Sequence, residues 1–280
     1  MMMLGTSPVS TLTGVNDVDA SESLSPRQEV EQLLAGDKGR LGDVFRRPGM
    51  EPDEVAADLN VASSAFVYNA RRMIDALLDG RPVSGPTFRR QVLSVFRSQI
   101  TRGRGVLSPS AMDLLLKNRA AIEAAGADED PVEAASEAAE EQQQAATTLA
   151  ELDGVPGIYA FSYGWYLESP VDPERGNTLI KVGQSINIGG RIRTHASNAR
   201  THIPEPLALI RAYSTGDRSP EQVERIFQDL LHAAGHHNPR RVSKSTGEEW
   251  FLTNEAYLDV IARTVGLRTI YTGRSEFATD

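Results

Sequence analysis

Two short glycine-containing runs in the C-terminal half hold the first residues that could do chemistry. GIYAF begins at Gly157 and KVGQS begins at Lys181, so Tyr159 and Lys181 occupy matched places in two strand-like runs. A phenol has an ordinary pKa of about 10, and a nearby cation stabilises its phenolate form. Lys181 could therefore help Tyr159 to act as a base near neutral pH. The ordinary alternative is that Tyr159 packs in a core and Lys181 protects the edge of a sheet.

The sequence around these two runs alternates between strand and helix patterns. Strands are predicted at GIYAFSYGWYL, NTLIKVGQS, PLALIRAYST and, as a short last strand, EEWFLT. Helices are predicted for residues 186–199, 219–235 and 254–266, and the second of these is the clearest because Ser219 can cap it and Pro220 can begin it. Gly189-Gly190 begins the first helix, where free N–H groups could contact a phosphate.

This order of elements resembles the GIY-YIG endonuclease superfamily. Gly157-Ile158-Tyr159 matches the GIY motif. Lys181-Val182-Gly183 stands where YIG is expected, with lysine in place of the second tyrosine, as in divergent phage-type members. The remaining matches are an Arg-x-x-x-His element (Arg191 and His195), a metal-binding glutamate (Glu224), a late Glu-Trp-Phe (Glu249-Trp250-Phe251) and, loosely, an asparagine (Asn238). The resemblance covers residues 155–265, and the stretch between its two strand motifs is longer than usual.

The resemblance implies a fold and an activity. The fold would be α+β, with a small three-stranded antiparallel sheet flanked by helices and an all-α domain before it. The activity would be metal-dependent hydrolysis of DNA to 5′-phosphate and 3′-hydroxyl ends. Five residues would be catalytic. Tyr159 would be the base or would position the water, Lys181 would be the cation beside it, and Arg191 would bind the phosphate. His195 would relay a proton, and Glu224 would be the ligand of one Mg²⁺ or Mn²⁺. Glu249 and Asn238 are further candidates.

Residues 27–122 read as a helical region. Val55 and Leu59 lie one turn apart, a break follows at Asn60-Val61, and a second helix begins near Ser64 and ends at Gly80. Two short helices across a tight turn are typical of a helix-turn-helix. Ordinary helical bundles show the same pattern, so both interpretations stay open.

A basic segment follows within this helical region. Residues 81–119 hold eight Lys/Arg and one Asp, a net charge of +7. Such a charge is typical of phosphate binding, although a solvated helix face is the plain alternative. The arginines predicted to bind nucleic acid are Arg89, Arg90, Arg97, Arg102 and Arg104, together with Arg193 in the later helix.

Composition predicts the domain boundaries. The chain of 280 residues is expected to comprise a disordered leader (1–26), the helical domain (27–122), an acidic Ala/Glu-rich linker (123–153), the nuclease-like domain (154–270) and a tail (271–280). Residues 120–153 hold ten acids and no base, and residues 154–280 hold fourteen of each. The overall charge of −9 therefore hides the basic segment.

The sequence also rules out several classes of protein. Without cysteine there is no disulfide framework, thiolate zinc site or cysteine nucleophile. No window is apolar enough for a membrane span, and the first residues lack the pattern of a signal peptide, so a cytoplasmic location without membrane contact is expected. Three functions remain open: a DNA endonuclease, a DNA-binding regulator with an inactive nuclease-like domain, and a helical module whose acidic linker binds a basic partner.

Overall fold

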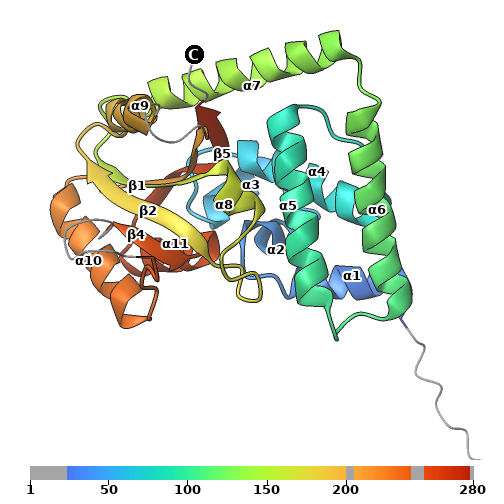
Figure 1. The fold of residues 1–280 in the computed structure, drawn as a ribbon. Coiled ribbons are helices and arrows are strands. Elements are labelled where there is room, and N and C mark those ends of the chain that lie inside the picture. The colour runs from blue at the N-terminus through green and yellow to red at the C-terminus, as the bar shows by residue number, and fades with distance from the viewer. Residues whose placement is uncertain (1–23, 200–204, 241–248, 278–280) are drawn as a thin grey trace, which may run out of the picture.

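The computed structural model describes residues 24–199, 205–240 and 249–277. Within these ranges the chain forms eleven helices and five strands, with helices first and a sheet in the C-terminal half (Figure 1). The predicted α+β class is confirmed. None of the helices in the described ranges has the length and hydrophobicity needed to cross a bilayer. Most of the predicted leader, residues 1–23, lies outside the described residues.

Six helices form the N-terminal half around two apolar clusters, and buried residues of the third helix belong to the smaller one. The larger cluster includes Leu34, Leu77, Phe96 and Leu115. Ser25 and Gln28 form a capping box at the start of the first helix, which explains why it begins there. The six helices are α1 (Pro26–Ala35), α2 (Arg40–Phe45), α3 (Pro52–Asp58), α4 (Ala65–Asp79), α5 (Pro86–Gly103) and α6 (Pro109–Ala127).

Helices α3 and α4 are the pair predicted as a helix-turn-helix. Asn60 lies in their connection with a φ of 54°, a left-handed conformation that asparagine tolerates. The connection also pairs with the C-terminal half: the Ala62 N–H donates to the Thr269 carbonyl (2.8 Å), and the Thr269 N–H donates to the Asn60 carbonyl (3.1 Å). The turn therefore holds the helical half against the sheet.

The predicted acidic linker forms a long packed helix, α7 (Pro131–Glu151), which runs from α6 to the sheet (Figure 1). Its own residues Ala145 and Leu149 are buried. Glu141 accepts hydrogen bonds from the N–H groups of Thr87 (2.9 Å) and Phe88 (2.8 Å). These N–H groups lie in the first turn of α5, where a helix has no partners of its own. The acidic helix thus caps α5 and connects both halves.

The sheet has five antiparallel strands, and the expected three-stranded sheet is wrong. The order is β4-β2-β1-β3-β5. Three of the four predicted strands lie in the middle. The fourth predicted strand, β4, and the unpredicted β5 pair with the two outer edges, satisfying backbone groups that would otherwise face solvent. Residues 271–277, predicted as part of a tail, belong to β5. The strands are β1 (Gly157–Tyr163), β2 (Thr178–Ser185), β3 (Leu207–Ser214), β4 (Trp250–Thr253) and β5 (Arg268–Phe277).

Helices cover both faces of the sheet. Ile158 and Ala160 of β1 share one apolar cluster with residues of α10 (Pro220–Ala233) and α11 (Glu255–Thr264). Tyr159 and Phe161 point to the opposite face, where α9 (Ile188–Ala199) and the end of α7 pack. The short helix α8 (Gly164–Glu168) follows β1 directly. Tyr159 therefore belongs to the face that carries α9.

Candidate active site

Strands β1 and β2 place Tyr159 and Lys181 on the same face of the sheet but not opposite each other. Tyr159 lies opposite Gly183, and Lys181 lies opposite Phe161. Because side chains alternate along a strand, these four positions share one face. The expected matched pair is therefore wrong by two residues in register, which makes Lys181 a diagonal neighbour of Tyr159.

The second motif needs a glycine at position 183 because the Tyr159 side chain leaves no room for a Cβ atom there. A Cβ atom on Gly183 would lie 2.5 Å from the hydroxyl of Tyr159. The Tyr159 ring therefore extends across Gly183, and any larger residue there would displace it. The side chain of Tyr159 is 1% exposed.

The start of α9 directs Arg191 and His195 toward the sheet. Asn187 caps this helix, accepting a hydrogen bond from the Gly190 N–H (2.9 Å). The Gly189 N–H donates to the Leu152 carbonyl (3.0 Å). Both glycine N–H groups are thus used within the protein, so the expectation that they contact a phosphate is wrong.

His195 forms the central contact of the site. Its Nε2 lies 2.9 Å from the hydroxyl of Tyr159, a hydrogen-bond distance. Its ring packs against Phe161, with centroids 5.1 Å apart. Burial and the positive charges of Lys181 and Arg191 lower the pKa of His195 to about 4. The imidazole is therefore neutral at pH 7 and can accept a proton.

Tyr159 is a neutral phenol in this environment. Burial raises its pKa above the ordinary value, and the carboxylates of Glu249 and Glu224 add to the rise, while the Arg191 guanidinium opposes it. Arg191 is the cation that lowers the pKa of Tyr159, whereas Lys181 pairs with Glu249, so stabilisation of a phenolate by Lys181 stays a prediction. A neutral phenol bonded to a neutral imidazole can pass a proton along but cannot serve as a standing base.

Lys181 instead interacts with two carboxylates. Its ammonium group lies 2.5 Å from a carboxylate oxygen of Glu249, just before β4. Burial and the charge of Glu249 raise the pKa of Glu224, whereas Lys181 and the backbone N–H of Gln184 oppose that rise. Lys181 therefore helps to keep Glu224 ionised.

These contacts bring six predicted residues together from separate elements. We call this group the polar cluster; it comprises Tyr159 (β1), Lys181 (β2), Arg191 and His195 (α9), Glu224 (α10) and Glu249. Asn238 is engaged elsewhere, since its side-chain oxygen accepts a hydrogen bond from the Arg240 N–H (2.9 Å). In the part of the chain that the structure describes, no hydrogen bond joins Asn238 to the polar cluster.

Most of the arginines predicted to bind nucleic acid are engaged inside the molecule. Arg89 pairs with Glu129 (2.5 Å), Arg90 with Glu276 (2.5 Å), Arg193 with Asp153 (2.6 Å) and Arg102 with Asp37. Arg97 donates to the Glu168 carbonyl. Arg104 is exposed and has no ion pair with any described residue. The net charge of the basic segment therefore overstates its free positive charge.

The aromatic surroundings of His195 were not predicted from the sequence. Trp250 contacts Phe161 edge to face (5.7 Å) and stacks on Tyr163 (5.7 Å). Phe161 and Tyr163 follow Tyr159 at every second position of β1, and that alternation could have identified them as a shared aromatic face. These rings exclude water from one side of the imidazole, which accounts for its burial.

Comparison with known proteins agrees with a nuclease-type domain at this position. Residues 158–266 match the family model of the T5orf172 domain, a phage-associated nuclease-like domain related to the GIY-YIG endonucleases. The match covers less than half of the chain and contains all six residues of the polar cluster. No curated protein and no solved structure matches the chain.

Proposed function

We propose that this protein is a metal-dependent DNA endonuclease and that the polar cluster hydrolyses the phosphodiester bond. The hydrogen bond between Tyr159 and His195, beside Arg191 and Glu224, carries this proposal. It unites a proton relay, a phosphate-binding cation and a carboxylate ligand at one place, and the nuclease-type domain supports the same reaction class. The helical half would position the DNA.

The proton relay follows from the ionisation states. The attacking water gives a proton to the Tyr159 oxygen as Tyr159 donates its own proton to Nε2 of His195, which is neutral. The water oxygen bonds to phosphorus, the bond from phosphorus to the 3′ oxygen breaks, and the 3′ oxygen that leaves takes a proton from solvent. A bound phosphate would raise the pKa of His195, because an anion favours the imidazolium form. Substrate binding would thus make His195 a better acceptor.

Arg191 would stabilise the negative charge that develops on the phosphate. Its side chain is exposed at the mouth of the site, beside the buried Tyr159. A planar guanidinium can donate two parallel hydrogen bonds to phosphate oxygens. Its position next to Tyr159 places the phosphate close to the relay.

Glu224 would hold the divalent ion. Its carboxylate lies near that of Glu249, and each repels the other's negative charge, as the raised pKa of Glu224 indicates. Oxygen ligands of this kind fit Mg²⁺ or Mn²⁺, which retain most of their waters. No group of three or more His, Cys, Asp or Glu residues suited to a metal occurs within the described ranges, so a closed zinc site does not fit. When bound, the ion would neutralise charge on the phosphate oxygens.

The proposal predicts nicking of supercoiled plasmid DNA that depends on Mg²⁺ or Mn²⁺. Wild-type protein should convert supercoiled to open-circular DNA with either ion, and EDTA should stop the reaction because it removes the ion that Glu224 would hold. Agarose-gel electrophoresis measures the conversion. Nicking that persists undiminished in EDTA would contradict the metal requirement. No nicking of plasmid or branched DNA, with salt-dependent DNA binding intact, would favour the inactive DNA-binding regulator.

A second prediction concerns the charge of His195. In protein free of DNA and metal, NMR titration should give His195 a pKa of about 4, below the ordinary 6.5. Lys181→Met should raise this pKa, because the positive charge of Lys181 opposes protonation. Glu249 acts in the opposite direction, so it is kept in the variant.

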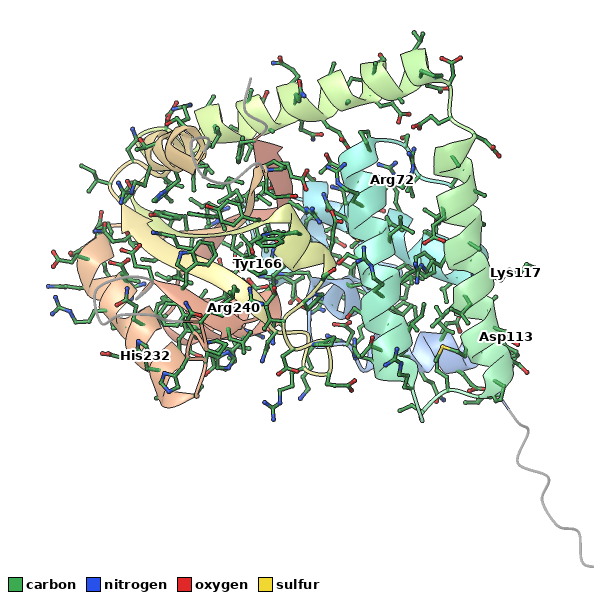
Figure 2. All side chains as sticks on the ribbon, viewed as in Figure 1. Arg72, Asp113, Lys117, Tyr166, His232 and Arg240 are labelled. Carbon is green, nitrogen blue, oxygen red and sulfur yellow. The ribbon has the colours of Figure 1, made fainter. Side chains whose placement is uncertain are left out.

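Lys117→Met is the matched control for that titration. Lys117 is an exposed lysine on α6, on the outer side of the helical half (Figure 2). Its loss should leave the His195 pKa unchanged. A wild-type pKa near 6.5 would show that His195 is hydrated and not part of a buried relay.

A further inference from the structure

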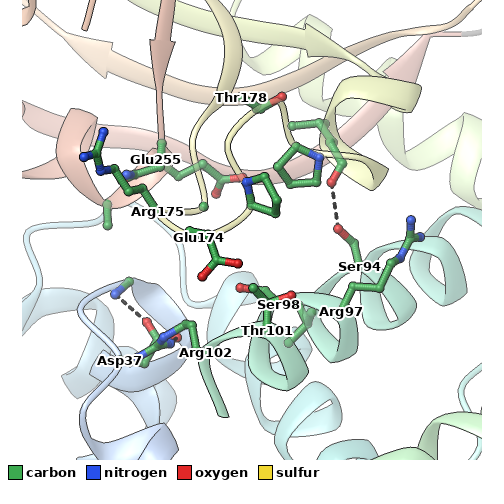
Figure 3. A pocket seen from close by; sticks show the side chains of 18 of the residues that line it. Asp37, Ser94, Arg97, Ser98, Thr101, Arg102, Glu174, Arg175, Thr178 and Glu255 are labelled. Carbon is green, nitrogen blue, oxygen red and sulfur yellow. Dashed lines mark hydrogen bonds and ion pairs between the residues drawn. The ribbon is translucent and has the colours of Figure 1, made fainter. Parts of the chain in front are cut away.

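A large cleft lies where the helical half meets the sheet, at the far end of β2 from Gly183. Its volume is about 980 Å³. Four parts of the chain form its walls: α5, the segment between α1 and α2, the connection from α8 to β2, and the start of α11 (Figure 3). We call it the junction cleft. Thr178, at the beginning of β2, lines it, whereas no residue of the polar cluster does.

Three of the four carboxylates that line the junction cleft form ion pairs with arginines. Asp37 pairs with Arg102 and accepts a hydrogen bond from Gln99 (2.9 Å). Two further lining carboxylates bind arginines that lie outside the cleft: Glu168 binds Arg274 (3.1 Å) and Glu255 binds Arg211 (2.8 Å). These acids therefore contribute little negative charge to the cleft.

Three of the cations that line the cleft are not neutralised by a described carboxylate. Lys38, Arg97 and Arg104 line the cleft, and none of them forms an ion pair with a carboxylate of residues 24–199, 205–240 or 249–277. Arg97 donates only to the Glu168 backbone carbonyl and, weakly, to that of Leu93 (3.5 Å). The balance of the cleft is therefore positive, although the chain as a whole is acidic.

Hydroxyl groups accompany these cations along α5. Ser94, Ser98 and Thr101 lie three or four residues apart, so they share the side of α5 that faces the cleft (Figure 3). Ser94 donates to the Leu167 carbonyl (2.7 Å), which keeps this wall in place. Arginine, lysine, serine and threonine are the side chains that usually contact the phosphates of nucleic acids.

We propose that the junction cleft binds the sugar–phosphate backbone of the DNA substrate, away from the bond that is cut. This inference rests on the proposed function. Thr178 and Gly183 are five residues apart on β2, or about 17 Å, which corresponds to about five base pairs of B-DNA. A duplex that reaches both places extends at least that far past the scissile phosphate. Contacts to phosphates fix the position of DNA without reading its sequence.

Glu174 provides a second test of the inference, in which the substitution should strengthen DNA binding instead of weakening it. It belongs to the connection between α8 and β2, and Figure 3 shows its carboxylate directed into the cleft. Unlike the other three lining acids, it has no ion pair with a described residue. Its negative charge should oppose a phosphate, so its removal should strengthen DNA binding.

The test uses fluorescence anisotropy to measure how the full-length protein binds a 30-base-pair duplex. EDTA is present, so no cleavage is expected. The double variant Lys38→Gln/Arg104→Gln should bind about 50-fold more weakly at 0.1 M salt, with a slope of log K against log salt reduced by about 2. Glu174→Gln should bind about fivefold more tightly. The changed side chains are exposed, so circular dichroism should show unaltered folding.

Two residues of α6 serve as matched controls, because they carry the same charges but do not line the cleft. Lys117→Gln and Asp113→Asn lie on α6 (Figure 2) and should leave the dissociation constant unchanged. If Lys117→Gln weakens DNA binding as much as Lys38→Gln or Arg104→Gln alone, the inference is overturned, since this would reveal a general charge effect.

The outcomes separate this inference from the proposed function. If wild-type protein cuts and binds DNA while the cleft variants bind it equally well, the cleft inference alone is wrong. Loss of ATP binding in the double variant with unchanged DNA affinity would also overturn it, since the cleft would then be a nucleotide site. A wild type that neither binds nor cuts any DNA would overturn both.

Discussion

Replacing Tyr159 by phenylalanine should lower the rate of DNA cleavage about 10²- to 10⁴-fold, the usual contribution of a positioned proton-transfer group. The variant removes only the hydroxyl that meets Nε2 of His195. The ring keeps its place across Gly183 and against Phe161, where the centroids are 6.1 Å apart. Loss of one hydrogen bond should cost about 1 kcal/mol in the free energy of unfolding, so the variant should fold.

Single-turnover cleavage with Mg²⁺ and anisotropy in EDTA separate chemistry from binding. Tyr159→Phe should lower the single-turnover rate and leave the DNA dissociation constant unchanged. Glu224→Gln should lower the rate at least as much, and added Mn²⁺ should not restore it. Tyr68→Phe, which removes an exposed hydroxyl on α4, is the control and should cleave like wild type. Cleavage by Tyr159→Phe within threefold of wild type would mean that Tyr159 is a packing residue.

The sequence predicted much of this site because its residues lie in short motifs on clear elements. Tyr159 stands in an apolar alternating run, and Arg191 and His195 are one helical turn apart, so their meeting on one face follows from strand and helix geometry. The partner of Lys181 was missed for a physical reason. Strand register depends on the packing of whole faces of the sheet. The register differs by two residues from the expected one, so Lys181 lies opposite Phe161 and pairs with Glu249 instead of lying opposite Tyr159.

The parts of the fold that could not be predicted depend on contacts between distant residues. Arg90 and Glu276 are 186 positions apart, so the sequence alone does not show that this arginine and this glutamate form a pair. Glu141 of α7 accepts hydrogen bonds from the first turn of α5, and helical periodicity does not predict such a contact. In β5, the polar run after Ile270 resembles a tail, and it becomes a strand because β3 offers a free edge.

Asp259 on α11 should give the largest loss of stability among single substitutions in the C-terminal half. It is 7% exposed and accepts hydrogen bonds from Arg211 (3.1 Å) and from the Tyr213 hydroxyl (2.9 Å). Arg40 of α2 forms an ion pair with it (3.2 Å). Asp259 therefore neutralises a buried arginine and ties the helical half to the sheet.

Asp259→Ala should lower the free energy of unfolding by about 3–5 kcal/mol, because it leaves Arg211, 2% exposed, with a single carboxylate partner in Glu255. Arg211 lies opposite Ala160, next to Tyr159, so the lost support reaches the polar cluster. Urea unfolding followed by circular dichroism measures the change. Asp113→Ala on α6, which removes an exposed carboxylate, should change the value by less than about 0.5 kcal/mol. If both variants unfold at the same urea concentration, the Asp259–Arg211 pair does not stabilise the fold.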